Sequence, residues 1–240
     1  MKEAGELFDE FSDSYQKSLD QALRASGEGR EYFAKGRVQW LKRCLAELNE
    51  IPRAVFDFGC GDGATSPILR EALGADSVLG TDTTPKSIAQ AKKAFANGSI
   101  AYTTLKEFRP TAECDVAYCN GVFHHIPPAE RMQNLSLVHS ALRPGGLFSF
   151  WENNPWNPGT RYVMWRVPFD RDAIMLTPIE ARDLLKEAGF QIVRVDYRFI
   201  FPRVLGFLRK LEDLLYPLPL GTQYHVLCRK PAASDRQLNP

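Results

Sequence analysis

An apolar segment that runs directly into three closely spaced glycines constrains this chain more than any other feature. The segment covers residues 54–58, and Gly59, Gly61 and Gly63 follow it. Glycine permits a sharp bend and lets a ligand approach the bare backbone. Residues 64–73 are expected to be helical, so the turn lies at a helix N-terminus with outward-pointing N–H groups. The sequence therefore predicts a strand, a turn and a helix that hold a nucleotide-type cofactor.

From residue 54 onward, strand patterns alternate with helix patterns. This alternation predicts an α/β fold in which helices cover both faces of a parallel sheet. The expected strands are 54–58, 77–82, 99–103, 114–119, 146–151, 190–199 and 223–229. The expected helices of this region are 64–73, 85–96, 128–142, 179–188 and an amphipathic helix near 203–216.

Length and composition favour a single domain over residues 1–240. A chain of 240 residues with 44% apolar residues is long enough for one sizeable α/β domain. We expect a helical cap over 1–50, a cofactor-binding core over 51–152 and an aromatic lid over 153–178. Residues 179–230 would complete the sheet, and 231–240 would form a tail.

The charge and the cysteines exclude several function classes. A net charge of +1 gives no electrostatic reason to expect nucleic-acid binding. The polar start and the absence of a long apolar run argue against a signal peptide and a membrane span. The five cysteines form no C-x-x-C pair, so we expect free thiols in a reducing cytoplasm and no metal site.

Three short motifs fall at the carboxyl ends of successive predicted strands, the edge at which open α/β sheets bind ligands. The first covers residues 57–63, the second ends at Asp82, and the third covers 119–126. A carboxylate at Asp82 can accept two hydrogen bonds from a ribose diol. The order and spacing of the three motifs therefore indicate a cofactor that carries a free ribose.

The glycine turn alone leaves two cofactors open. Residues 59–64 also match the G-x-G-x-x-A fingerprint of dinucleotide-binding proteins, which expects an acid further on as well. However, Asp57, Asp62 and Asp82 would surround a doubly negative pyrophosphate with further negative charge. The acids suit S-adenosylmethionine better, because it brings an ammonium and a sulfonium group.

The successive motifs resemble those of class I S-adenosylmethionine-dependent methyltransferases. They are residues 57–63, 80–82, 114–125 and the Leu-Arg-Pro-Gly-Gly element at 142–146, which is characteristic of the small-molecule branch. The Phe-Asp…Tyr pattern at 8–15 is similar to the helical cap of ubiquinone/menaquinone-type members. The resemblance covers about residues 5–230. It implies a Rossmann-like, seven-stranded, mostly parallel sheet with an antiparallel last strand and an N-terminal helical cap.

The resemblance also implies which residues bind S-adenosylmethionine. The matching positions are Asp57, Gly59, Cys60, Gly61, Gly63, Asp82, Thr83, Asn120, Gly121 and Val122. The glycines would cradle the methionine part, Asp82 would hold the ribose, and 120–122 would line the cofactor beneath its methyl group. The acid that usually contacts the adenine is replaced by 103–105, so a hydroxyl or the backbone would make that contact. From the N-terminal helices, Tyr15 would cap the cofactor and Arg37 would bind its carboxylate.

Two adjacent histidines, His124 and His125, follow the fourth predicted strand. A histidine there could remove a proton from the methyl acceptor, because its pKa lies near working pH. Adjacent side chains point in different directions, so we expect at most one to be catalytic and favour His125. The alternative is that one or both only pack or hydrogen-bond the loop.

An aromatic stretch over 151–171 is expected to cover the acceptor pocket, or else to be a loop packed by its own tryptophans. Its candidate substrate-binding residues are Glu152, Asn153, Trp156, Arg161 and Trp165. Aromatic rings would grip an apolar substrate, and an arginine would meet an acidic group.

The sequence thus predicts methyl transfer to a small organic metabolite by in-line displacement, with oxygen, nitrogen and carbon acceptors all open. An NAD-linked oxidoreductase and a non-catalytic cofactor-binding module are the alternatives. The protein would be a monomer or a homodimer. We expect the helix near 203–216 to bury its apolar side against the sheet or lid. Docking on a membrane surface or dimerisation through this helix is the alternative, and a polar face that is not strongly basic argues against membrane contact.

Overall fold

In a computed structural model of the chain, residues 23, 26–167 and 173–232 are described. The strands are β1 (Ala54–Phe58), β2 (Ser77–Asp82), β3 (Ile100–Thr104), β4 (Cys114–Asn120), β5 (Leu142–Asn153), β6 (Gln191–Arg198) and β7 (Gln223–Arg229). The helices are α2 (Arg30–Glu47), α3 (Thr65–Leu73), α4 (Pro85–Phe95), α5 (Pro128–Ala141), α6 (Pro158–Arg166), α7 (Pro178–Glu187), the 3₁₀ helix η3 (Arg203–Leu211) and α8 (Glu212–Leu215).

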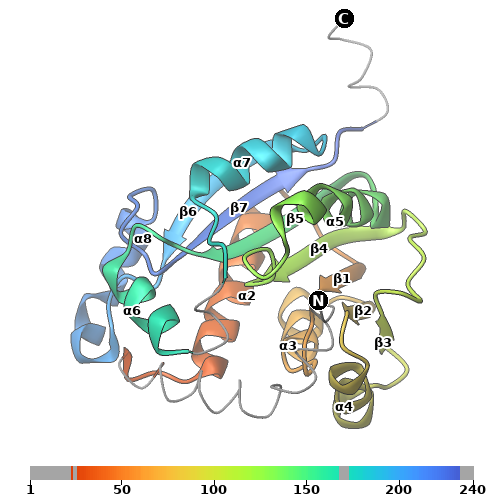
Figure 1. Cartoon of the computed structure of the whole chain (residues 1–240), viewed down its shortest axis with the longest axis horizontal. Coiled ribbons are helices and arrows are strands. Elements are labelled where there is room, and N and C mark those ends of the chain that lie inside the picture. Colours follow the sequence, from red (N-terminus) through yellow and green to blue (C-terminus); the bar gives the residue numbers. More distant parts are fainter. Residues whose placement is uncertain (1–22, 24–25, 168–172, 233–240) are drawn as a thin grey trace, which may run out of the picture.

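The seven strands form one sheet in the order β3-β2-β1-β4-β5-β7-β6 (Figure 1). Strands β1 to β5 pair in parallel, and β7 is antiparallel to both β5 and β6. This confirms the predicted mixed sheet with an antiparallel last strand. Strand order reverses at β1, which pairs with both β2 and β4, and such switch points open a crevice at the carboxyl edge.

Helices cover both faces of the sheet, as the sequence predicts. Val55 and Phe56 are neighbours in β1 and identify the helices on each face, because successive strand residues point to opposite faces of the sheet. Val55 packs in a cluster that includes buried residues of α2, α3 and α4, whereas Phe56 packs in a cluster with buried residues of α5 and α7. The α2 helix therefore belongs to the same layer as the helices that follow β1 and β2.

A buried hydrogen bond attaches α2 to the far end of the sheet. The indole N–H of Trp40 donates to Oδ2 of Asp196 in β6, at 2.9 Å. The same oxygen lies 2.7 Å from Nε of Arg194 and 3.6 Å from Nδ1 of His225. Since buried polar groups need partners, these contacts fix the position of α2 over the sheet.

Three parts of the chain differ from the sequence-based expectation. Strand β5 begins at Leu142, because Leu142 already pairs with Cys114. The expected lid contains a helix, α6, whose first turn is capped by the side chain of Asn157. The expected amphipathic helix near 203–216 is a 3₁₀ helix followed by one α-helical turn, and no residue of η3 is buried. The predicted burial of its apolar side against the sheet or lid was therefore wrong for Val204, Leu205 and Leu211, which are exposed.

Some predicted features lie outside the described residues, including most of the first cap helix with Tyr15 and most of the tail. Within the described residues, no helix has the length and apolar character needed to cross a membrane.

Candidate active site

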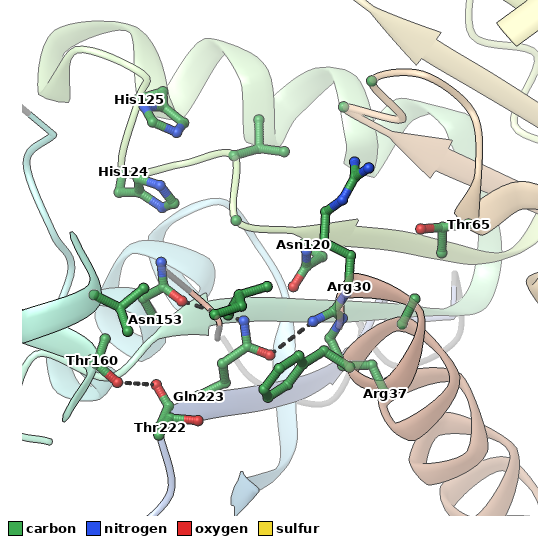
Figure 2. A pocket seen from close by; sticks show the side chains of 18 of the residues that line it. Arg30, Arg37, Thr65, Asn120, His124, His125, Asn153, Thr160, Thr222 and Gln223 are labelled. Carbon is green, nitrogen blue, oxygen red and sulfur yellow. Dashed lines mark hydrogen bonds between the residues drawn. The ribbon is translucent and has the colours of Figure 1, made fainter. Parts of the chain in front are cut away.

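A cleft of about 1450 Å³ lies at the carboxyl edge of the sheet. It is lined by the ends of β1, β2, β4 and β5, by α2 and α6, and by residues 199–202. Figure 2 shows how these elements bring their side chains together from distant parts of the sequence. Pockets for one small ligand typically measure about 300–1,000 Å³, so this cleft has room for two reactants.

The glycine turn after β1 forms one wall of the cleft. Gly59, Gly61 and Gly63 have φ angles of +72°, +55° and +79°. A Cβ atom at Gly61 would meet nothing within 4 Å, which leaves the backbone open to a ligand. A Cβ atom at Gly59 would lie 2.3 Å from the side chain of Val122, so this glycine lets the loop after β4 approach the turn.

Gly63 does not line the cleft. A Cβ atom there would lie 2.7 Å from the Ala91 Cβ and 2.9 Å from the Tyr102 ring. The Tyr102 hydroxyl also donates to the Gly63 carbonyl, at 3.0 Å. The sequence grouped Gly63 with the cofactor cradle, whereas the structure places it in the packing between the turn, α4 and β3.

Asp57 is buried at the end of β1 and lines the cleft. Its Oδ2 accepts a hydrogen bond from the Ser66 hydroxyl at 2.7 Å. Burial, opposed in part by that bond and assisted by the carboxyls of Asp82 and Asp62, raises the pKa of Asp57 from 3.8 to about 7. A carboxyl group in this environment is stabilised in its charged form by a cation.

Asp82 closes the turn from β2. Its two carboxylate oxygens accept hydrogen bonds from the backbone N–H groups of Gly61, at 3.0 Å, and Thr84, at 2.9 Å. Asp82 and Thr83 both line the cleft. Cys60 also lines it, and burial raises the pKa of its thiol, so the thiol is neutral at physiological pH.

The end of β4 supplies the third motif. Asn120, Gly121 and Val122 line the cleft. Among the residues that the structure describes, the buried Asn120 Oδ1 has no hydrogen-bond partner. An oxygen acceptor without a partner at the edge of a cleft is available to a ligand.

Arg37 reaches the cleft from α2 and is buried. Its Nε donates to the Tyr118 hydroxyl at 3.0 Å. Its Nη1 donates to the side-chain oxygen of Gln223, also at 3.0 Å (Figure 2). Both partners are neutral, and no ion pair of Arg37 occurs within the described part of the chain. Among the described residues this buried cation therefore has no carboxylate within ion-pair distance, although its charge opposes the rise in the pKa of the Asp57 carboxyl.

Of the two histidines, His124 is built into a dyad. Its Nδ1 lies 2.5 Å from Oε2 of Glu152, whose other oxygen accepts the backbone N–H of Phe123 at 2.7 Å. His124 lines the cleft, whereas Glu152 lies behind it with 1% of its surface exposed. Glu152, expected to touch substrate, thus reaches the cleft only through His124.

His125 also lines the cleft, and its ring centroid lies 4.0 Å from that of His124. Burial, with a smaller effect of His124, lowers the pKa of His125 to about 2. His125 is therefore neutral over the physiological pH range and a weak base.

Sequence reasoning missed Arg131, which holds the histidine loop in place. Its Nε donates to the carbonyls of Phe123, at 3.1 Å, and Ile126, at 3.0 Å, and its Nη2 donates to the carbonyl of Ile174, at 2.6 Å. Nothing in the local pattern of α5 distinguishes this arginine from a solvent-exposed one.

The acceptor side of the cleft differs from the expectation. Asn153 lines it, but Trp156, Arg161 and Trp165 are exposed and do not. The reason is that α6 turns its other side inward, where Tyr162, Val163 and Met164 line the cleft.

The loop after β3 leaves its threonine hydroxyls away from the cleft. Thr103 and Thr104 lie 3.4 and 2.9 Å from the Glu107 carboxylate, to which they donate. Only Leu105 of this segment lines the cleft. A hydroxyl contact to an adenine ring from this loop is therefore not supported.

Comparison with known proteins agrees with this geometry. Residues 55–146 match the family model described as "Methyltransferase domain". Trans-aconitate 2-methyltransferase of Rhodopseudomonas palustris (strain BisB5) is 25% identical over 160 residues, which are 65% of this chain and 62% of the relative. The Escherichia coli O139:H28 protein of the same name is 25% identical over 168 residues, 67% and 66% of the two chains. The chain thus spans slightly less than two thirds of these relatives.

Solved structures share the fold. An S-adenosylmethionine-dependent methyltransferase from Thermotoga maritima superposes with a TM-score of 0.65 at 16% identity, over 95% of this chain and 99% of that chain. One from Mesorhizobium loti gives a TM-score of 0.55 at 24% identity, over 75% and 91%.

Proposed function

We propose that this chain, which belongs to the class I S-adenosylmethionine-dependent methyltransferases, transfers a methyl group to a small organic acceptor. The proposal rests on one observation: the glycine turn and the His124–Glu152 dyad lie at the same cleft. An acid-lined glycine turn suits a cationic methyl donor, and the His124–Glu152 dyad stands across the cleft at the end of the neighbouring strands. Transfer is an in-line displacement that needs alignment and exclusion of water.

The residues of the cleft fit S-adenosylmethionine. The open backbone at Gly61, the Asp57 carboxyl with its raised pKa and the unpartnered oxygen of Asn120 offer acceptors and space to a cation. Asp82 would hold the ribose, with Thr83 beside the adenine and Leu105 against the ring. When bound, the cofactor supplies an activated methyl group. A dinucleotide would instead bring its pyrophosphate against three carboxyl groups, so the NAD-linked alternative has no support.

We assign His124, rather than His125, as the base that removes a proton from the acceptor. The Glu152 carboxylate accepts the Nδ1–H of His124, so Nε2 is left as the proton acceptor and the imidazolium that forms is stabilised. A pKa of about 2 makes His125 a poor base. The dyad supports an acceptor that must lose a proton.

Arg37 would bind an anionic group, for which the cofactor carboxylate is our candidate. A buried charge without a direct ion pair is costly, so a ligand that supplies a carboxylate gains from the pairing. The rest of the acceptor side is mainly apolar, with Tyr162, Met164 and Phe201 along it. We therefore infer an acceptor with an apolar body. The curated relatives are named for trans-aconitate, and this acid belongs in any substrate screen.

We further propose that residues 1–240 form one methyltransferase domain, with α2 in its cap and α6 in its lid. Two hydrogen bonds support the lid, because the side chains of Asn157 and Thr160 donate to the carbonyls of Leu220, at 2.7 Å, and Thr222, at 2.7 Å. Five free cysteines support a reducing cytoplasm as the place of action. A monomer or homodimer remains our proposal for the assembly.

Calorimetric titration of the purified full chain with S-adenosylhomocysteine and with NADH tests the cofactor. We expect binding of the first alone, and binding of NADH alone would overturn the proposal. A screen of small acceptors, including trans-aconitate, for methyl incorporation from labelled donor tests catalysis. His124→Asn should abolish incorporation and keep S-adenosylhomocysteine binding. If cofactor binds and no acceptor is methylated, the non-catalytic module is favoured.

A further inference from the structure

The run formed by η3 and α8 presents an apolar face to solvent. Val204, Phe207 and Leu214 have 81%, 77% and 77% of their surfaces exposed. With Leu211 and Leu218, which are also exposed, they define what we call the outer face. The four residues between 204 and 214 recur at three- and four-residue steps, so they share one side of the helical run. Leu218 lies in the turn that follows α8.

The opposite side of the run is firmly attached to the protein. Glu212 is buried, and its carboxylate accepts the backbone N–H groups of Phe199, Ile200 and Phe201, at 3.3, 3.1 and 3.0 Å. Arg209 forms an ion pair with Glu28 at 2.8 Å and lines the cleft. The outer face is therefore held outward by specific contacts on its inner side.

The charges around the outer face include two cations that no described residue neutralises in an ion pair. Arg203 and Lys210 are exposed on the run, and neither forms an ion pair with another described residue. The exposed carboxylate of Asp213 is already paired with Arg198, at 3.1 Å, and Arg43, at 3.3 Å. Cationic side chains beside exposed apolar ones complement an anionic lipid surface.

Helix α6 adds further exposed cationic and apolar side chains near the outer face. It lies beside the end of the run, because the Asn157 side chain donates to the Leu220 carbonyl at 2.7 Å. Figure 1 shows α6 and α8 at the same end of the molecule. Arg161, Trp165 and Arg166 are exposed on α6, and the segment 153–167 contains no acidic residue.

We propose that the outer face docks on the surface of a bilayer that contains anionic phospholipids. The apolar side chains enter the boundary between headgroups and acyl chains, and Arg203 and Lys210 lie near lipid phosphates. A second copy of the chain is disfavoured, because a two-fold contact would bring the same cations together. Phe201 and Pro202 of the cleft wall directly precede the run, so docking brings the rim of the cleft to the bilayer.

Co-sedimentation of the full chain with vesicles tests this inference. We expect binding to phosphatidylcholine mixed with phosphatidylglycerol, weaker binding to phosphatidylcholine alone, and loss of binding at high salt. Phe207→Ser with Leu214→Ser should weaken binding about tenfold or more, and Lys210→Gln about fivefold. The matched control is Ile51→Ser with Ile179→Ser, two exposed apolar residues in the loop before β1 and on α7, which should bind like the original chain.

Three results would overturn the inference. They are no binding to either vesicle, equal binding by the outer-face variant and the original chain, and a dimer in sedimentation velocity that the outer-face variant abolishes. The last would assign the face to a second copy. Since these measurements involve no methyl transfer, their outcome is independent of the proposed activity.

Discussion

Nδ1 of His124 lies 2.5 Å from Oε2 of Glu152, and both residues are buried at the carboxyl edge of the sheet. The two strands that lead to them, β4 and β5, pair side by side up to Asn120 and Trp151. Glutamate holds the imidazole by one oxygen and the loop backbone at Phe123 by the other. This arrangement fixes the ring and its tautomer before an acceptor binds.

Glu152→Gln should lower kcat by about 10²- to 10⁴-fold, because His124 loses the carboxylate that orients it and stabilises its protonated form. Affinity for S-adenosylhomocysteine, measured by calorimetry, should stay within a few-fold. His125→Asn is the matched control in the same loop and should keep most of the activity. The opposite pattern, with activity lost only in His125→Asn, would transfer the role of base to His125.

The raised pKa of Asp57, about 7, predicts a pH dependence of donor binding. A bound ammonium or sulfonium favours the ionised carboxylate, and an amino group of the donor stays protonated below about pH 7.7. Affinity should therefore rise by up to about tenfold per pH unit as pH increases towards 7. Asp57→Asn should bind weakly and without this slope, whereas Asp62→Asn should retain it.

The same group affects the stability of the ligand-free protein. Between the ordinary pKa of 3.8 and the raised value of about 7, the folded state binds more protons than the unfolded state. The free energy of unfolding should therefore fall as pH rises through this range. Urea unfolding at several pH values should show the fall in the original chain and a flatter profile in Asp57→Asn. Equal profiles would contradict the burial of this charge.

Two glycine substitutions should separate cofactor contact from packing. Gly63→Ala places a Cβ atom 2.7 Å from Ala91, so it should cost about 2–4 kcal/mol of stability through overpacking and left-handed strain. Gly61→Ala meets no atom within 4 Å and should cost about 1–2 kcal/mol, but it should weaken donor binding. Thermal unfolding and calorimetry measure the two effects. Equal stability losses would contradict the distinction.

Asp82→Asn should weaken S-adenosylhomocysteine binding by about 10- to 100-fold, because the charged acceptor that we propose for the ribose is lost. Asp76→Asn, at an exposed position in the turn before β2, is the control and should bind like the original chain. Calorimetry provides the measurement, and circular dichroism checks that both variants fold. Unchanged affinity in Asp82→Asn would refute the ribose assignment.

The local sequence pattern was enough to predict most strands of the sheet. Strands 54–58, 77–82 and 223–229 have the predicted bounds, because strand periodicity and turn residues act over a few neighbouring positions. The glycine turn and the acid at Asp82 were also evident, since both follow from where a strand ends. These features identify the carboxyl edge of the sheet, where we propose that the cofactor binds.

Only the tertiary structure decided which of these residues face the cleft. Glu152 is paired with a histidine 28 positions earlier in the chain, and Arg37 bonds Gln223 across 186 positions. Gly63 is needed for packing, and the apolar side of the 203–216 segment faces solvent. Spacing along a chain determines the period of an element and the residues at its end, but burial and partners depend on contacts between distant segments. The sequence by itself therefore determined the architecture and the chemistry of the edge, and the folded chain decided the roles of its side chains.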